Sequence, residues 1–279
     1  PIAVTAGDFN GDGKQDLAVT NYNDNTLGIF LGTGTGTFQP QVTYATGSAP
    51  QGITVSDYNG DGRQDLAVVN HSSNTFSVFI GTGTGTFQTA LTSSTGSVPQ
   101  FITTSDFNND GKQDLAVVLS GSDSVGIFLG TGTGTFQPQV TYSTGSYPKG
   151  ITTGDYNGDG KRDLALTNYN SNTFSILLGT GTGTFQTQVA YATGSAPQDI
   201  ATGDFNGDGK QDLAVINNTS DTLSIYLGTG SGTFQSQVSY ATDSDPQGIA
   251  IADLNGDNKL DIAVTNVNST LGVYYTVCP

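Results

Sequence analysis

The chain contains no methionine and no tryptophan, and it has one histidine and one cysteine among 279 residues. All 24 acidic residues are aspartate, so glutamate is absent as well. Glutamate and methionine favour helices, whereas glycine, asparagine, aspartate and threonine, which dominate here, do not. The composition therefore disfavours all-α and α/β folds.

Basic residues are scarce, eight in all, which leaves a formal charge of −16 and a pI near 4.1. Binding of nucleic acid through a basic face is not expected at this pI. No apolar run approaches the roughly 18 residues of a membrane-spanning helix. The one cysteine, Cys278, cannot form an internal disulfide. Because the chain begins at Pro1 and lacks Met, we expect a processed form, a trimmed form or a fragment, from which a signal peptide could have been removed.

One segment of 49 residues recurs along the whole chain, beginning each time with a proline. Six complete units would need six times 49 residues, which is 15 more than the chain has, and the shortfall lies in unit six. We predict a single domain, 1–279, made of these repeats. The units are 1–49, 50–98, 99–147, 148–196, 197–245 and 246–279.

Each unit contains four short runs of strand length. In the second unit they are 52–56, 65–69, 75–80 and 87–94, bounded by Gly, Asn, Asp, Ser or Pro. Four strands in a repeat of roughly 40 to 50 residues are typical of a propeller blade. A β-solenoid would show shorter periods. The sequence therefore predicts an all-β fold, a six-bladed β-propeller of four-stranded antiparallel blades, with the last blade lacking its outer strand.

Alternating Gly and Thr residues separate the third and fourth runs, at 32–37, 81–86, 130–135 and 179–184. Glycine reaches positive φ without strain, so these tracts predict hairpin turns.

An acidic loop joins the first and second runs. In unit one it reads Asp-Phe-Asn-Gly-Asp-Gly-Lys-Gln-Asp over residues 8–16, with side-chain oxygens at positions 1, 3, 5 and 9. The residue at position 7 would offer its backbone carbonyl, and the glycine at position 6 permits a sharp turn. Ca²⁺ takes six to eight oxygen ligands, and an EF-hand loop uses a similar alternation.

The loop recurs six times, which predicts up to six Ca²⁺ ions, one for each repeat. Unit six has Asn258 at position 6, which tolerates the left-handed conformation. The predicted ligands are Asp8, Asn10, Asp12, Lys14, Asp16; Asp57, Asn59, Asp61, Arg63, Asp65; Asp106, Asn108, Asp110, Lys112, Asp114; Asp155, Asn157, Asp159, Lys161, Asp163; Asp204, Asn206, Asp208, Lys210, Asp212; Asp253, Asn255, Asp257, Lys259, Asp261.

Asx-turns alone would explain the residue types of these loops, since Asp, Asn and Gly are common in turns. They do not explain three aspartates within nine residues, six times over. Like charges so close repel unless a cation lies between them, and the loops hold 18 of the 24 aspartates. Mg²⁺ demands stricter geometry, so Ca²⁺ is favoured.

The Asp-Phe-Asn-Gly-Asp-Gly-Lys-x-Asp-Leu-Ala-Val string resembles the FG-GAP or VCBS repeats of the integrin α-subunit propeller and of many secreted proteins, over essentially the whole chain. The Phe-Gly pair that gives the family its name is not kept, because Phe38 and its counterparts in the other repeats are followed by Gln. The resemblance implies a calcium-stabilised propeller, secreted or at the extracellular surface, that acts in binding or adhesion. It names no ligand.

No catalytic constellation is evident, so an enzyme is not expected. The varied turns opposite the acidic loops are the better candidates for ligand binding, through Tyr22, His71, Tyr147 and Tyr169. Unconstrained sequence change at surface turns would also explain this variation. A protein-binding or adhesion module is favoured, a carbohydrate-binding lectin is second because the chain has no tryptophan for sugar stacking, and a structural subunit of an extracellular assembly is third.

The last blade is expected to expose its third strand, 270–275, as an open edge. A segment upstream of Pro1 is the preferred source of a fourth strand. A neighbouring molecule is the second possibility, with self-association through the edge and an intermolecular disulfide at Cys278, and a bare edge is the third.

Overall fold

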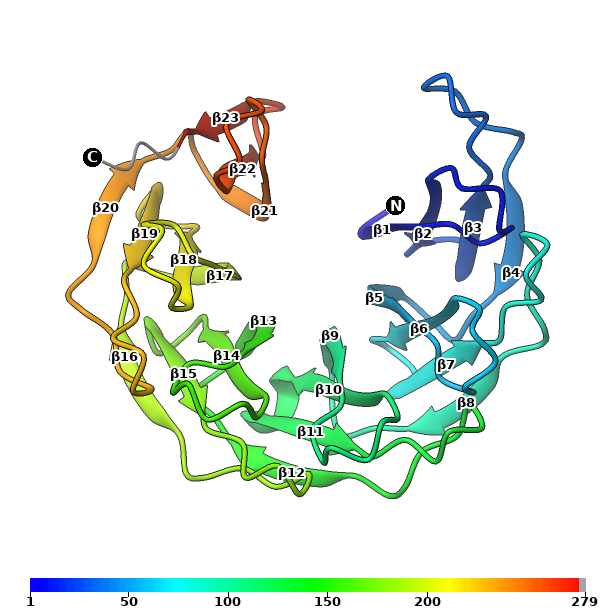
Figure 1. Cartoon of the computed structure of the whole chain (residues 1–279), viewed down its shortest axis with the longest axis horizontal. Coiled ribbons are helices and arrows are strands. Elements are labelled where there is room, and N and C mark those ends of the chain that lie inside the picture. The colour runs from blue at the N-terminus through cyan, green and yellow to red at the C-terminus, as the bar shows by residue number, and fades with distance from the viewer. Residues whose placement is uncertain (276–279) are drawn as a thin grey trace. The chain divides into compact units, whose positions relative to one another are not determined.

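The computed structural model describes residues 1–275, so Cys278 and its expected disulfide lie outside the described residues. The fold is an all-β six-bladed propeller, as predicted, and its sheets are drawn in Figure 1. The described residues contain one short 3₁₀ turn, η1 (Ser120–Ser122), and no α-helix. No helix within residues 1–275 has the length and apolar character needed to cross a bilayer.

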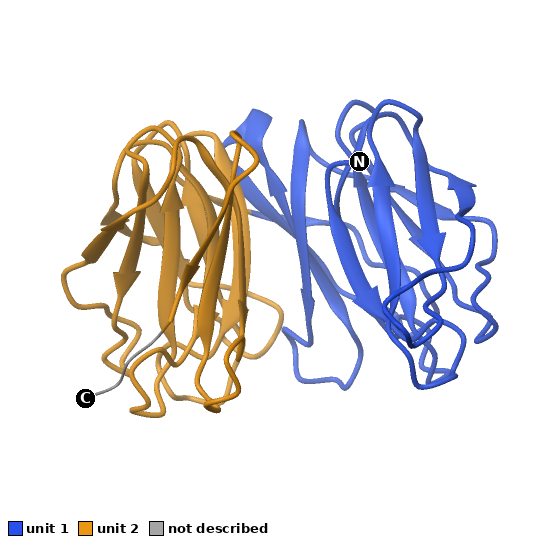
Figure 2. Ribbon diagram, turned by 90° about the horizontal axis from the view of Figure 1, so that it is seen from above, with its two compact units in different colours: residues 1–141 blue, residues 142–279 orange. Residues whose placement is uncertain are grey.

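The chain divides into two compact units, residues 1–141 and 142–279, coloured separately in Figure 2. The single-domain organisation stays a prediction. Unit 1 holds blades 1 to 3, although the last strand of blade 3 crosses the boundary. Their strands are β1 (Val4–Gly7), β2 (Asp16–Asn21), β3 (Thr26–Phe30), β4 (Val42–Ala45); β5 (Pro50–Ser56), β6 (Asp65–Asn70), β7 (Thr75–Phe79), β8 (Leu91–Ser94); β9 (Pro99–Ser105), β10 (Asp114–Leu119), β11 (Ser124–Phe128), β12 (Val140–Ser143).

Unit 2 holds blades 4 to 6. Blades 4 and 5 are four-stranded, and blade 6 has three strands among the described residues, as predicted. The strands are β13 (Pro148–Gly154), β14 (Asp163–Asn168), β15 (Thr173–Leu177), β16 (Val189–Ala192); β17 (Pro197–Gly203), β18 (Asp212–Asn217), β19 (Thr222–Tyr226), β20 (Val238–Ala241); β21 (Pro246–Ala252), β22 (Asp261–Asn266), β23 (Leu271–Tyr274).

The second strand of each of blades 2 to 5 is buried on both faces. In β6, Leu66 and Val68 pack toward blade 1, whereas Ala67 and Val69 pack toward blade 3, and all four side chains are fully buried. Burial on both faces requires a continuous apolar run rather than alternation. This explains the Leu-Ala-Val signature that follows each acidic loop.

The predicted fourth strand of blade 2, 87–94, is too long. The strand β8 begins only at Leu91, and Phe87 is joined to Gly81 by an isolated bridge. The Phe87 ring instead turns inward against Phe9 and Tyr44 of blade 1. The segment between hairpin and strand therefore packs neighbouring blades together.

Candidate metal-binding loops and turn face

The acidic loops join the first and second strands of every blade, and in blades 1 to 5 each lies beside the hairpin of its own blade. The backbone is left-handed at position 6, where the sequence predicts a sharp turn, and also at position 4: Gly13 has φ of +78° and Gly11 has φ of +75°. In blade 6, Asn258 has φ of +64° in place of a glycine. The expectation that asparagine is tolerated there is confirmed.

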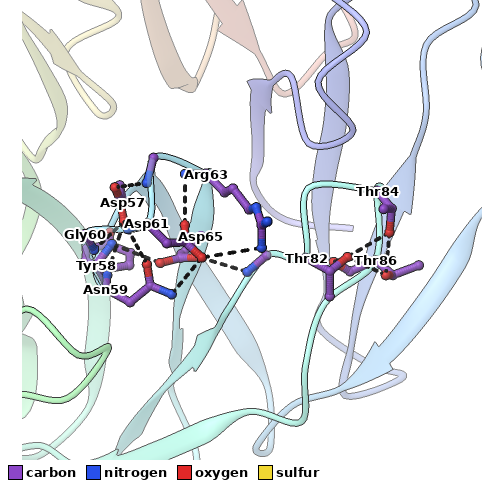
Figure 3. Close-up of polar contacts among 12 residues, drawn as sticks. Asp57, Tyr58, Asn59, Gly60, Asp61, Arg63, Asp65, Thr82, Thr84 and Thr86 are labelled. Atoms are coloured by element: carbon purple, nitrogen blue, oxygen red, sulfur yellow. Dashed lines mark hydrogen bonds and ion pairs between the residues drawn. The ribbon is translucent and has the colours of Figure 1, made fainter.

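The first aspartate of the loop is the hub of the local hydrogen bonds, as Figure 3 shows for blade 2. The Gly60 N–H donates to Asp57 Oδ1 and the Gly62 N–H to Asp57 Oδ2, each at 2.7 Å. Position 3 supports the same turn, because Asn59 Oδ1 accepts the Asp61 N–H at 2.9 Å. These bonds satisfy the amide groups of the loop and hold its backbone in the turn.

The aspartate at position 5 pairs with the cation at position 7. Lys14 Nζ lies 3.1 Å from Asp12 Oδ2, and the same ion pair recurs in blades 2 to 5. The hydrogen bond from the Lys14 side chain lowers the pKa of the Asp12 carboxyl. Both side chains are more than one third exposed, so such a pair is weak and easily exchanged for another cation.

The aspartate at position 9 has a different environment. Asp163 is fully buried; its Oδ2 accepts the Tyr156 N–H at 2.9 Å and its Oδ1 accepts the Gly179 N–H at 2.7 Å. Burial raises the pKa of this carboxyl to about 6, although the two N–H donors oppose the shift. Position 9 thus fastens the acidic loop to the Gly-Thr hairpin, a structural role that the sequence analysis did not assign.

Oxygen donors for a hard cation are present in all six loops, where Oδ2 of the first aspartate accepts the N–H of position 6. A carboxylate oxygen that accepts one such bond has a second lone pair for a cation. The described residues bring no group of three or more carboxylate, histidine or cysteine side chains together as a metal cluster. The donor types, carboxylate, amide and backbone oxygens, are those that Ca²⁺ takes, and the calcium assignment stays a prediction.

The Gly-Thr hairpins have the predicted positive φ at two of their three glycines, as in Gly83 and Gly85. Their threonine hydroxyls converge, with Thr82 Oγ1 lying 2.8 Å from Thr84 Oγ1 and 2.7 Å from Thr86 Oγ1 (Figure 3). This network stiffens the turn beside each acidic loop, and alternation alone did not predict it.

On the opposite side of the blades, the four candidate ligand residues form two pairs. The rings of Tyr22 and His71 lie 6.4 Å apart in unit 1. Tyr147 and Tyr169 lie 6.2 Å apart, edge to face, in unit 2. The structure thus brings each tyrosine beside a partner from the adjacent turn.

A lysine that the sequence analysis missed joins the second pair. Lys149 Nζ lies 3.9 Å from the centroid of the Tyr169 ring and 5.9 Å from that of Tyr147. It also donates to Gln198 Oε1 at 2.7 Å, and burial lowers the pKa of its amine. Four other repeats carry glutamine at this position, so the change to lysine was the available signal: Gln51, Gln100, Gln198 and Gln247.

The FG-GAP-like repeat family matches five overlapping segments that together span most of the chain. They are residues 8–68, 57–117, 106–166, 155–215 and 204–264. No curated protein sequence matches the chain at a significant level.

Several solved structures share the fold at low sequence identity. A lectin from Agrocybe aegerita that recognises non-reducing terminal N-acetylglucosamine has a TM-score of 0.65 at 18% identity, covering 98% of this chain and 80% of that one. BBS1N, solved in complex with ARL6DN, has a TM-score of 0.68 at 14% identity, covering 97% and 76%. A catalytically inactive virginiamycin B lyase from Staphylococcus aureus has 0.68 at 16%, covering 99% and 80%. At these identities the likeness shows the fold alone.

Proposed function

Because the chain belongs to the FG-GAP-like repeat family and repeats one acidic loop in every blade, we propose that it is a calcium-binding extracellular β-propeller that binds a protein partner. The acidic loops are the calcium sites, and the varied turns on the opposite side are the recognition surface. The observation that carries the proposal is the recurrence of the same oxygen-rich loop, with the same hydrogen bonds from blade to blade.

Charge supports calcium as the ion. Six divalent ions would reduce the formal charge from −16 to about −4, because the loops hold 18 of the 24 aspartates. Ca²⁺ binding would replace the exposed ammonium of the position 7 lysine, as the partner of the position 5 aspartate, with a divalent ion. The amide bonds to the first aspartate would keep the loop in place. The carboxylates would supply charge and the asparagine and backbone oxygens would complete the shell.

Thermal unfolding in EGTA and in 2 mM Ca²⁺ tests the calcium sites. Extracellular modules bind Ca²⁺ with Kd of roughly 10⁻⁴–10⁻³ M, so each site should add about 0.6–1.8 kcal/mol at this concentration. We expect Tm to rise by several degrees. Asp12→Ala should lower the number of bound ions by one in calorimetry, whereas Asp24→Ala, which removes the same charge from an exposed turn, should not. An unchanged Tm in calcium would refute the assignment.

Recognition of a protein partner is supported by the Tyr147–Tyr169–Lys149 cluster, since aromatic residues with a buried polar partner are typical of interface anchors. Tyr169→Ala should weaken capture of that partner in pull-downs from the surrounding extracellular material, and Tyr22→Ala tests the unit 1 pair in the same assay.

A glycan is the second candidate ligand, because the same two rings with a lysine and a glutamine beside them combine an apolar face with polar donors. A glycan array separates the two. Saturable binding of a defined sugar that Tyr169→Ala abolishes would favour the lectin.

A further inference from the structure

An apolar cavity of about 390 Å³ opens between the outer strands of blade 5 and the sheet of blade 6, both in unit 2. Its walls include Phe205, Leu223, Ile225, Tyr240, Ile262 and Tyr274. None of these side chains is charged, so the cavity suits an apolar group.

Between blades 1 and 2, a phenylalanine fills the space that corresponds to this cavity. Phe87 is 7% exposed, and its ring centroid lies 5.6 Å from that of Phe9 and 5.7 Å from that of Tyr44. Phe79 and Leu66 complete the same cluster. A ring from the hairpin side of one blade therefore seals the space against the preceding blade.

The residues around Phe87 correspond position by position to the walls of the cavity. The repeat spacing takes Phe9 to Phe205 and Tyr44 to Tyr240. The strand register does the same for the third strand, because Leu66 pairs with Phe79 in blade 2 and Ile262 with Tyr274 in blade 6.

Blades 4 and 5 repeat the arrangement within unit 2. There Phe234 packs edge to face against Tyr156, Phe174 and Tyr191, with centroids 5.6–5.8 Å apart. The cavity at blade 6 is thus lined by the repeat equivalents of the residues that surround a phenylalanine in the other blades. No described residue of blade 6 corresponds to that phenylalanine.

The edge of the sheet beside the cavity is also open. Within residues 1–275, β23 pairs with β22 only, whereas the third strand of blade 5 pairs with a fourth strand through Ile225 and Val238. Leu271 is 63% exposed on β23, and Tyr240 is 48% exposed at the mouth of the cavity.

We propose that the open edge of β23 and the adjacent cavity bind an extended polypeptide segment from outside residues 1–279, with the pattern Phe-Gln-x-Gln-Val-x-Tyr. The segment lies antiparallel to β23, its phenylalanine enters the cavity, and its valine lies opposite Val273. Main-chain hydrogen bonds supply part of the affinity and the phenylalanine supplies selectivity. The pattern comes from the segments that lead into the fourth strands of the four-stranded blades, where four segments share it: 38–44, 136–142, 185–191 and 234–240.

The partner is a free segment rather than a second copy of this chain. In one copy, the fourth strands β4, β8, β16 and β20 are each paired over four residues with the third strand of their own blade. A second copy would have to break one of these ladders to donate a strand, whereas an unstructured segment would not. This inference requires neither calcium nor the turn face.

Fluorescence anisotropy with a labelled synthetic peptide tests the proposal. The probe has the sequence of residues 229–242, Thr-Gly-Ser-Gly-Thr-Phe-Gln-Ser-Gln-Val-Ser-Tyr-Ala-Thr, and is titrated with the 279-residue chain in calcium and in EGTA. We expect saturable binding with one peptide per chain. The same peptide carrying Phe234→Ala should bind at least about tenfold more weakly, because it lacks the buried ring.

A protein variant tests the same site from the other side. Tyr274→Lys places a charge in the cavity and should weaken the peptide at least tenfold, whereas Val267→Lys, on an exposed turn of the same blade, should not. The Phe234→Ala peptide keeps the experiment decisive if Tyr274→Lys fails to fold. Absence of binding at millimolar concentration, or equal binding of both peptides, would overturn the proposal. So would sedimentation as a dimer that does not bind the peptide, since a second copy would then occupy the edge.

Discussion

Phe87→Ala should destabilise unit 1 much more than Phe38→Ala does. The two residues occupy the same position of the repeat, and both lie in residues 1–141. Phe87 is 7% exposed between blades 1 and 2, whereas Phe38 is 43% exposed and its ring lies 6.5 Å from that of Phe30. The pair therefore isolates the value of sealing the space between two blades.

The magnitudes follow from buried area. A phenylalanine buries roughly 150–250 Å², and at about 25 cal/mol per Å² nearly complete burial of Phe87 is worth about 4 kcal/mol. Phe→Ala substitutions in cores cost about 3–5 kcal/mol, including the cavity that remains. Half-burial of Phe38 is worth about 2 kcal/mol, and solvent can fill the space it leaves. We expect a difference of about 2 kcal/mol, or roughly thirtyfold in the unfolding equilibrium.

Urea unfolding followed by far-UV circular dichroism measures this difference. The Phe87 N–H bond to the Tyr44 hydroxyl, at 3.1 Å, uses the backbone and survives in both variants, so the comparison reports on the ring. With an m-value of about 2 kcal/mol/M, the two midpoints should differ by about 1 M. Equal midpoints would mean that the space between blades does not depend on the ring, and the assignment of the blade 6 cavity would lose its physical basis.

Two further predictions concern other parts of the repeat. Gly81→Ala should lower the free energy of unfolding by about 3 kcal/mol, because its Cβ would lie 2.2 Å from the Gln64 carbonyl oxygen. Gly62→Ala, where φ is +79° and the space is open, should lower it by about 1 kcal/mol. Thermal unfolding measures both, and equal losses would contradict this. Burial raises the pKa of Asp199 to about 6, so the folded state holds its proton more tightly than the unfolded state. The contribution of protonated Asp199 to the free energy of unfolding is complete below about pH 3.8 and is lost as the pH rises through about 6. Asp199→Asn should therefore be about 2 kcal/mol more stable than the parent chain at pH 7 and equal to it near pH 4, as measured by urea unfolding at both pH values; a constant difference would refute the shift.

The blades were predictable because their signals repeat at one fixed spacing. The acidic loop, the apolar middle strand and the Gly-Thr hairpin appear in the same order in units one to five, so a structure predicted for one unit applies to the others. The middle strand was the clearest case, since Leu66 to Val69 are buried on both faces and need no alternation. The outer strand was less clear, because Phe87 belongs to the packing between blades rather than to the ladder of β8.

The remaining features depend on contacts between distant residues. The role of Asp163 requires Gly179, which lies 16 residues further along and joins it only after the hairpin has folded. The cluster at Lys149 requires Gln198, which occupies the same position of the next repeat. Proximity across one whole period is invisible within a single unit, so local patterns predicted the residue types of the site but not their partners.

The phenylalanine of each of blades 2 to 5 fills the gap to the blade before it, and the gap to the blade after it is left for the next repeat. Phe87 of blade 2 and Phe234 of blade 5 both follow this rule. A duplication of one whole repeat would therefore copy both the phenylalanine and the residues that surround the phenylalanine of the next blade. Such arrays can grow by copying without any new interface having to evolve, which suits a chain whose units are nearly identical in sequence.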